Sequence, residues 1–489
     1  MTLLLGLDIG TTNVKAVATD LDGTILAEHS RSVEIFHLPN SAVRQKMPDI
    51  IVASLDVLRE TVTRVDASRV KAIGISSQGG AMQLLEPDHS PNGDVVSWLD
   101  MTGGAEDQAF TTRKGHDWLA SRIGRGRSGL AIGQILRLQN ESPEFLQPPQ
   151  RVGFVGDVVT HFLCGRSATD ATSLGLTLLY NPYKKDYDSD LLTELKIDKS
   201  QLPELLVPQQ PAGTLLPEVA RQIGLSGDVL VSVPVHDQYA AALGTGAVHS
   251  GDVMFGAGTA WVLLAVSDRL VATATDDAFL CTHLVPHLYG QIVSLSNGGS
   301  SFQWAVNLLG LQSLIPDEID RMILDVPAGC DGLHFWPLLS SFDVAGLQPG
   351  TRGRLMGLQL YHTQAHVMRA VVEGLACELF RYLRFLHNSG ITMKRLIMCG
   401  KAGASVITPQ ILADVTDLPV MCASYSGASA LGAAVLAAGI LEPGESLQRI
   451  AERMAAPVRE VLPGANREIY RRLRQEYLAS LPWHSEWRT

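Results

Sequence analysis

LLLGLDIGTTNVKAVAT, residues 3–19, and DVMFGAGTAWVLLAV, residues 252–266, have the same design and stand near the starts of the two halves of the chain. In each, an apolar run of strand length ends in a glycine-threonine turn, and a second strand-like run follows. Superposing Gly10-Thr11 on Gly258-Thr259 gives an offset of 258 − 10 = 248 residues, close to half of the 489 residues. One such turn is unremarkable, but two at this spacing predict a duplicated domain.

The rest of the chain is predicted to alternate strands and helices. Asp22-Gly23 is a strong hairpin signal between the runs 14–19 and 24–28. Apolar runs and helical periodicity predict helix 50–65, strand 70–76, strand 229–233, helix 363–387, strand 395–399 and helix 426–441. We expect an α/β fold of two domains, residues 1–246 and 247–489, with one or two packing helices in the charged tail 445–489.

Composition excludes several classes of protein. The chain is 46% hydrophobic and 18% charged, so it can bury a core and is not disordered. Its net charge of −11 and its pI near 5.7 disfavour binding to nucleic acid or to an anionic membrane. The six cysteines form no CxxC pair, the N-terminus lacks the basic region of a signal peptide, and no apolar run reaches the length of a membrane span. We therefore predict a cytoplasmic protein that contacts no nucleic acid and no membrane.

Several common catalytic motifs are absent from the sequence. Gly400-Lys401 lacks the context of a P-loop, and Gly244-Thr245-Gly246 does not complete GxGxxG. No HExxH motif occurs, and no GxSxG stretch is convincing. P-loop, dinucleotide and zinc-hydrolase functions are therefore disfavoured.

The first glycine-threonine turn has the chemistry of a phosphate site. Glycine lets backbone N–H groups approach an anion closely, and threonine adds a hydroxyl donor. Gly10, Thr11 and Thr12, with Lys15 shortly after, could grip the terminal phosphates of a nucleotide. Asp8 could hold a magnesium ion directly or through water. The alternative is two ordinary hairpins, with Asp8 capping its own turn.

A carboxylate stands between an apolar strand and a small-residue helix. In PVHDQY, residues 234–239, Asp237 lies where ligands approach open α/β sheets, and it could accept a proton from a hydroxyl that attacks a γ-phosphate. The alternative is that Asp237 caps a helix beginning at Gln238. His236 is expected to be a wall residue, because no second ligand stands at metal spacing.

These segments resemble motifs of the FGGY carbohydrate kinases, a family of the actin, Hsp70 and hexokinase superfamily. The resemblance rests on the Asp237 segment and on residues 8–15 (DIGTTNVK), 72–78 (AIGISSQ), 98–100 (WLD), 169–173 (TDATS), 258–260 (GTA), 410–415 (QILADV) and 430–434 (ALGAA). It implies two duplicated ribonuclease H-like domains of the actin-like ATPase type flanking a central cleft. ATP and Mg²⁺ are the implied cofactors, a small sugar is the implied substrate, and a homodimer is a further expectation by analogy.

Carried over residue by residue, the resemblance implies these roles. Asp237 is the general base, and Asp8 lies near magnesium. Phosphates are contacted by Gly10, Thr11 and Thr12 from one domain and by Gly258 and Thr259 from the other. The nucleoside is approached by Gly299, Gln303, Gly400, Lys401 and Ala402, and the sugar by Gln78, Asp100, Asp237 and Gln238.

The chain departs from the family pattern at three places. Residues 400–405 read GKAGAS instead of GGGAKS, residues 78–81 read QGGA instead of the QMHG of xylulose kinases or the QRET of glycerol kinases, and the WxDxR element ends in Thr102. A ketose such as xylulose is the first expectation, because Gln78 and WxD remain. A polyol such as glycerol or an aldonic acid such as gluconate comes next, although no arginine stands at the matched sugar positions. The alternatives of another class are a nucleotide-dependent chaperone or filament protein and a degenerate nucleotide- or sugar-binding protein.

Overall fold

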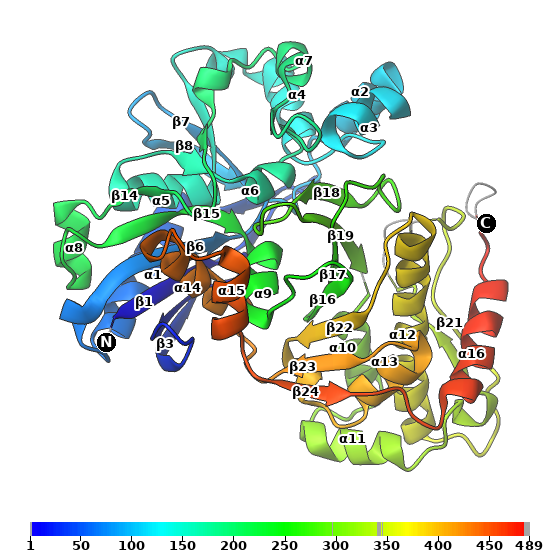
Figure 1. Cartoon of the computed structure of the whole chain (residues 1–489). Coiled ribbons are helices and arrows are strands. Elements are labelled where there is room, and N and C mark those ends of the chain that lie inside the picture. The colour runs from blue at the N-terminus through cyan, green and yellow to red at the C-terminus, as the bar shows by residue number, and fades with distance from the viewer. Residues whose placement is uncertain (1, 296, 340–343, 345, 484–489) are drawn as a thin grey trace.

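Two β-sheets organise the structure, one in each half of the chain. The computed structural model describes residues 2–295, 297–339, 344 and 346–483. In Figure 1 the first half, blue to green, forms the left and upper part, and most of the second half, green to red, forms the lower right part. Helices pack against the strands of both sheets, which confirms the predicted α/β class.

The N-terminal sheet has the strand order β14–β15–β6–β1–β2–β3. Its strands are β1 (Leu3–Ile9), β2 (Asn13–Thr19), β3 (Ile25–Ser32), β6 (Val70–Ser77), β14 (Pro211–Thr214) and β15 (Leu230–His236). The first three strands form an antiparallel meander, and β6 and β15 run parallel to β1. The predicted hairpin joins β2 to β3, and Gly23 in its turn has a φ of 82°.

The C-terminal sheet repeats this pattern, with the order β18–β19–β17–β16–β22–β23–β24. Its strands are β16 (Asp252–Ala257), β17 (Trp261–Ser267), β18 (Phe279–Thr282), β19 (Tyr289–Leu295), β22 (Arg395–Cys399), β23 (Val420–Ala423) and β24 (Val458–Val461). The order β19–β17–β16–β22–β23 matches β3–β2–β1–β6–β15 in strand directions. The duplication predicted from the two turns is confirmed.

A lobe is inserted between β3 and β15 of the N-terminal sheet. Its own sheet has the order β4–β5–β8–β7–β9, from β4 (Phe36–His37), β5 (Val43–Gln45), β7 (Met82–Leu85), β8 (Pro91–Val96) and β9 (Arg151–Phe154). The lobe helices at the top of Figure 1 are α2 (Gly104–Lys114), α3 (His116–Ile123), α4 (Ala131–Glu141) and α7 (Ser189–Glu194).

Two helices at equivalent positions join the halves. α9 (Asp237–Thr245) follows β15, and α14 (Ala428–Leu441) follows β23. α14 crosses to the first half, where it packs on β1, β6 and α9, as the brown helix beside the blue strands in Figure 1. Glycine permits this approach, because a Cβ on Gly74 would overlap the Ala433 carbonyl and a Cβ on Gly432 would overlap the Ala240 carbonyl. The division of the chain into domains at residue 246 stays a proposal. α14 belongs by sequence to the predicted domain 247–489, but it packs against strands of the predicted domain 1–246.

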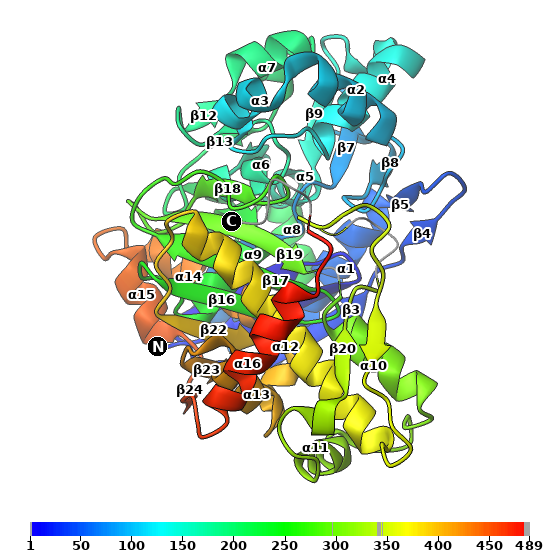
Figure 2. The same cartoon turned by 90° about the vertical axis from the view of Figure 1, so that its right-hand side faces the viewer.

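The remaining helices cover the sheets. In the first half they are α1 (Met47–Val62), α5 (Val155–Cys164), α6 (Ala171–Gly175) and α8 (Pro217–Ile223). In the second half they are α10 (Gly299–Leu308), α11 (Pro316–Leu324), α12 (Gln364–Asn388), α13 (Thr408–Thr416), α15 (Leu447–Met454) and α16 (Arg467–Ala479). Figure 2 shows α16 beside the long α12.

The predicted helices 50–65, 363–387 and 426–441 correspond to α1, α12 and α14. The tail contains α15 and α16, as predicted, and its residues 484–489 lie outside the described residues. Within the described ranges, no helix is both long enough and apolar enough to cross a membrane.

Candidate active site

Two carboxylates lie together where the parallel strands of the N-terminal sheet end. Asp8 is the next-to-last residue of β1, and Asp237 begins α9 directly after β15. The register pairs Asp8 with Ser76 of β6, and Ser76 with Val235 of β15, so both acids lie at one edge of the sheet. The Asp8 carboxylate accepts a hydrogen bond of 2.8 Å from the Ser76 hydroxyl. Asp8 is therefore tied to the neighbouring strand, and the alternative that it caps its own turn does not hold.

Asp237 is oriented by side chains rather than used as a helix cap. His236 occupies the cap position and Asp237 lies inside α9, so the capping alternative is wrong. Nε2 of Gln238 donates to Oδ1 of Asp237 over 3.1 Å, and Nε2 of His236 lies 3.2 Å from the same oxygen. The Asp237 side chain is 27% exposed, so a ligand can reach it. Gln238 also faces the second half, because a Cβ on Gly256 of β16 would lie 3.4 Å from its Oε1.

His236 is a buried wall residue, as expected from the sequence. Burial lowers the pKa of His236 to about 3, so the imidazole is neutral and adds no charge beside Asp237. Its ring stands against Gly79, where a Cβ would lie 2.5 Å from the His236 Cδ2 atom. The absence of a side chain at residue 79, one of the departures from the QMHG pattern, is thus matched by the bulk of His236.

Burial raises the pKa of both carboxylates. The pKa of Asp8 rises to about 7, mainly through burial and further through the negative charge of Asp237, while the Ser76 hydrogen bond and Lys15 oppose the rise. Burial raises the pKa of Asp237 to about 6, against the hydrogen bonds from Gln238. Two repelling carboxylates in one partly buried place would be stabilised by a divalent cation, so the donor set fits Mg²⁺.

We expect Asp237→Asn protein, free of nucleotide and Mg²⁺, to melt about 2–4 °C above the wild type at pH 8 and about half as far above it at pH 5. The folded state holds the Asp237 proton more tightly than the unfolded chain, because its pKa is raised from 3.8 to about 6. Its stabilising contribution is therefore present below the unfolded pKa and lost as the pH rises through the folded pKa. Calorimetric melting at both pH values tests this, and equal shifts at the two pH values would contradict it.

The first turn is closed by its own backbone. The N–H of Gly10 donates to the Asn13 carbonyl over 3.0 Å, and Thr12 is exposed. Lys15 stands opposite Asp8 in the register of β1 and β2, with Nζ 5.6 Å from the ring centre of Tyr425. Because Tyr425 belongs to the second half of the chain, Lys15 lies where the halves meet.

Hydrogen bonds among Thr11 of this turn and three further side chains link the turn to the lobe. The Thr11 hydroxyl donates to Oε1 of Gln78 over 3.1 Å and accepts from the Trp98 indole N–H over 2.9 Å. Gln78 donates to Oε1 of Gln45 over 3.1 Å, and Gln45 donates to the Thr11 carbonyl over 2.9 Å. Thr11, expected at the phosphates, and Gln78, expected at the sugar, are thus in direct contact.

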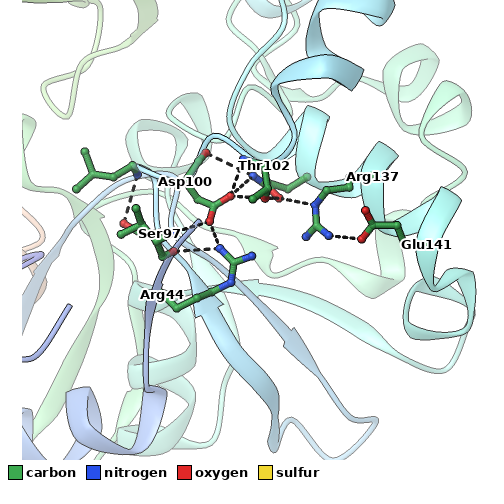
Figure 3. A network of polar contacts seen from close by, with 9 residues as sticks. Arg44, Ser97, Asp100, Thr102, Arg137 and Glu141 are labelled. Atoms are coloured by element: carbon green, nitrogen blue, oxygen red, sulfur yellow. Dashed lines mark hydrogen bonds and ion pairs between the residues drawn. The ribbon is translucent and has the colours of Figure 1, made fainter. Parts of the chain in front are cut away.

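Asp100, expected to face the sugar, is surrounded by protein donors (Figure 3). Its Oδ2 accepts from the Val43 N–H over 2.6 Å and from Arg44, and its Oδ1 accepts from Nε2 of Gln134 over 2.9 Å. The backbone N–H of Thr102, at 2.9 Å, and the Thr102 hydroxyl also donate to Oδ1. A carboxylate has about four acceptor positions. In this conformation Asp100 orders the lobe and has no acceptor position left for a sugar hydroxyl.

Arg44 supplies a positive charge that the sequence motif lacks. Thr102 stands where the family pattern has arginine, but Arg44 comes from β5 to pair with the same Asp100 carboxylate (Figure 3). Burial lowers the pKa of Arg44, and the positive charge of Arg137 lowers it further. Nε of Arg137 donates to Oε1 of Gln134 over 3.2 Å, so the two arginines border one network.

The second turn meets the start of α10. The N–H of Gly299 donates to the Gly258 carbonyl over 3.1 Å, and the N–H of Ser300 donates to the Thr259 carbonyl over 2.9 Å. Gly258 and Thr259 are exposed. The turn and the first turn of α10 therefore form one surface.

The end of β22 joins this surface. Gly400 has a φ of 98°, and a Cβ on it would lie 2.9 Å from the Ala257 carbonyl oxygen. Lys401 and Ala402 follow in the short 3-10 helix Lys401–Ala404. Gln303 lies along α10 and donates to Asn307 over 3.1 Å.

Four residues of these networks had no assigned role in the sequence interpretation. Arg44 and Gln45 lie in a three-residue strand without a motif, and Trp98 belongs to the WLD element but has no predicted role of its own. Arg459 of β24 holds the loop after β22, with NH2 3.3 Å from the Gly403 carbonyl and 3.1 Å from the Ser405 carbonyl. Only Trp98 carried a signal that could have identified it.

Models of one protein family match both halves of the chain. The model of the FGGY family of carbohydrate kinases, N-terminal domain, matches residues 3–244, and the C-terminal domain model of that family matches residues 253–439. A xylulose kinase of Lactococcus lactis subsp. lactis is 25% identical over 443 residues, which cover 90% of this chain and 88% of that protein.

Two solved structures have the same fold. A gluconate kinase from Lactobacillus acidophilus has a TM-score of 0.89 at 22% identity, with 98% of this chain and 97% of that chain covered. A glycerol kinase from Plasmodium falciparum, solved with ADP, has a TM-score of 0.89 at 19% identity, with the same shares covered.

The duplicated sheets have the actin-like ATPase fold, which the two solved kinases share. The chain belongs to the FGGY family of carbohydrate kinases. The resemblance identified from the sequence motifs is confirmed. Kinases of this family use ATP as the phosphoryl donor, which fits the two exposed turn regions.

Proposed function

We propose that this kinase transfers the γ-phosphoryl group of ATP to a hydroxyl of a ketose such as xylulose, with Asp237 as general base. The observation that carries the proposal is a reachable carboxylate with a pKa of about 6 at the edge of the sheet where the two halves meet. A base with a pKa near the working pH is both largely deprotonated and able to take a proton.

The residues around Asp237 suggest how one oxygen is directed to the sugar. Gln238 donates to Oδ1, and His236 lies beside the same atom, so Oδ2 is left to accept the proton of the attacking hydroxyl. The sugar oxygen then forms a bond to the γ-phosphorus, and the bond from that phosphorus to the β-phosphate bridging oxygen breaks. Positioning and charge neutralisation supply most of the catalysis in such transfers.

The two turns are proposed to hold the polyphosphate from opposite sides. Gly10, Thr11 and Thr12, with Lys15 beside them, would act from the first half, and Gly258 and Thr259 from the second. Gly299, Gln303, Gly400, Lys401 and Ala402 are proposed to line the nucleoside site.

Mg²⁺ is the proposed metal, and Asp8 is the residue proposed to hold it, directly or through water. When bound, the ion neutralises charge on the β- and γ-phosphate oxygens. Asp8 fits this role because Ser76 fixes its carboxylate and Asp237 repels it, so a cation would relieve that repulsion.

The ketose assignment is supported by Gln78 and by similarity to a xylulose kinase. The Gln78 amide is buried but lies beside exposed Trp98, at the place proposed for the sugar. Direct contact of Asp100 with the sugar remains a prediction, and it would need one of the protein donors around Asp100 to move.

An aldonic acid such as gluconate is a second candidate. Arg44 and Arg137 place two positive charges at the lobe network, and a carboxylate would be attracted to them. Because Asp100 and Glu141 already pair with these arginines, the ketose stays the first candidate.

ADP release measured across ketoses, polyols and aldonic acids tests the proposal. We expect the largest kcat/KM for a ketose, with D-xylulose as the first compound to test. A larger value for gluconate would favour the second candidate, and release that no sugar stimulates would contradict sugar phosphorylation. A homodimer remains a prediction by analogy, which light scattering of the purified protein tests.

A further inference from the structure

A chain of hydrogen bonds with only one possible direction runs from Trp98 to the first turn. An indole N–H can only donate, so the Thr11 hydroxyl accepts from Trp98 and keeps its own proton for Gln78. Gln78 then presents its NH₂ group to Gln45, and Gln45 presents its NH₂ group to the Thr11 carbonyl, which can only accept. The indole N–H at one end can only donate and the carbonyl at the other end can only accept. An amide that exchanged its donor and acceptor positions would therefore lose its hydrogen bonds to both neighbours.

The members of this chain differ in their exposure. Gln45 has no exposed surface and Gln78 is 5% exposed, so each amide relies on its protein partners. Trp98 is 42% exposed and comes from the segment after β8 of the lobe. An exposed lobe residue is therefore the first donor of a network whose buried members clamp Thr11 by both its hydroxyl and its carbonyl.

We propose that Trp98 is a positioning residue for the phosphate side of the site, acting through Thr11. The inference rests on the proposed function insofar as the first turn binds a nucleotide. The Thr11 hydroxyl already accepts one hydrogen bond and donates another, so its contribution is to hold the turn rather than to donate to a phosphate. Loss of the Trp98 N–H removes one of the three hydrogen bonds that hold Thr11 and leaves its hydroxyl held by Gln78 without the donor from the lobe.

Trp98→Phe tests this, because it keeps an aromatic ring and removes the N–H. We expect Mg·ADP affinity, measured by calorimetry without sugar, to fall about 2–10-fold, the range for one neutral hydrogen bond. Thr11→Val is expected to have a similar effect, and the double variant is expected to bind as weakly as the weaker single variant. Thr11→Ser, which keeps the hydroxyl, is expected to bind Mg·ADP nearly as the wild type does.

Trp336→Phe is the matched control. Its indole N–H also donates over 2.9 Å to a hydroxyl, that of Ser480, but this bond joins the last residue of β20 (His334–Trp336) to the residue after α16, in the second half. Mg·ADP affinity should not change in this variant.

Unchanged Mg·ADP affinity in Trp98→Phe would overturn the inference, as would effects of Trp98→Phe and Thr11→Val that multiply in the double variant. Failure of the wild type to bind Mg·ADP would overturn the nucleotide site and the inference together. Wild-type protein that binds Mg·ADP but phosphorylates no sugar would contradict the proposed function alone, and the affinity comparison would still decide the role of Trp98.

Discussion

Replacing Asp237 with asparagine is expected to lower kcat by about 10²–10⁴-fold, because an amide cannot accept the proton of the attacking hydroxyl. The substitution keeps the size of the side chain, and its amide oxygen can still accept from Gln238. Binding of Mg·ADP should change far less than kcat, since the loss occurs in the transition state. Initial rates of ADP release at saturating ATP and sugar measure the effect.

Asp107→Asn is the matched control for this experiment. Burial also raises the pKa of Asp107 to about 6, but its carboxylate accepts from Ser128 in the lobe, away from the two turns. The control should keep kcat within about threefold of the wild type if position, rather than an unusual pKa, makes Asp237 a base. Near-normal kcat in Asp237→Asn would contradict the assignment.

Arg44→Met is expected to destabilise the protein by about 3 kcal/mol, because it leaves the Asp100 carboxylate buried without its cation. The value is near the lower end for a broken buried ion pair, since Val43, Thr102 and Gln134 still donate to Asp100. Urea unfolding followed by tryptophan fluorescence measures the change.

Arg166→Met is the control for this pair. Arg166 also pairs with a carboxylate, that of Glu204, and does so through two nitrogens. Both of these side chains are exposed, and such pairs contribute about 0–1 kcal/mol. The double variant Arg44→Met/Asp100→Asn should be more stable than Arg44→Met alone. Equal losses at the buried and the exposed pair would contradict the account of the lobe network.

Much of the fold could be predicted because local pattern and final structure agree. Residues 3–19 and 252–266 alternate or run apolar around glycine-threonine turns, and each forms the central hairpin of its sheet. The crossing of α14 to the first half could not be predicted in this way. Residues 428–441 are apolar on all sides, so their periodicity says that the helix is buried but not which sheet covers it.

The arrangement of the candidate site was predictable where a motif marks its residues, as at Asp8 and Asp237, whose carboxylates lie near enough to repel each other. The roles of both residues stay predictions. The contacts were not predictable where the two side chains are far apart in the sequence and no motif marks them. Arg44 and Gln45 sit side by side in β5, yet one reaches Asp100 and the other reaches Thr11. Adjacent strand residues point to opposite faces, and what lies on each face depends on segments far away in the sequence.

Transfer of ³²P from [γ-³²P]ATP to D-xylulose, with wild type and Asp237→Asn compared, tests the central claim most directly. The account predicts labelled sugar phosphate with the wild type and a loss of about 10²–10⁴-fold in its rate of formation with Asp237→Asn. Label that appears only as inorganic phosphate, or labelled sugar formed at equal rates by the two proteins, would contradict it.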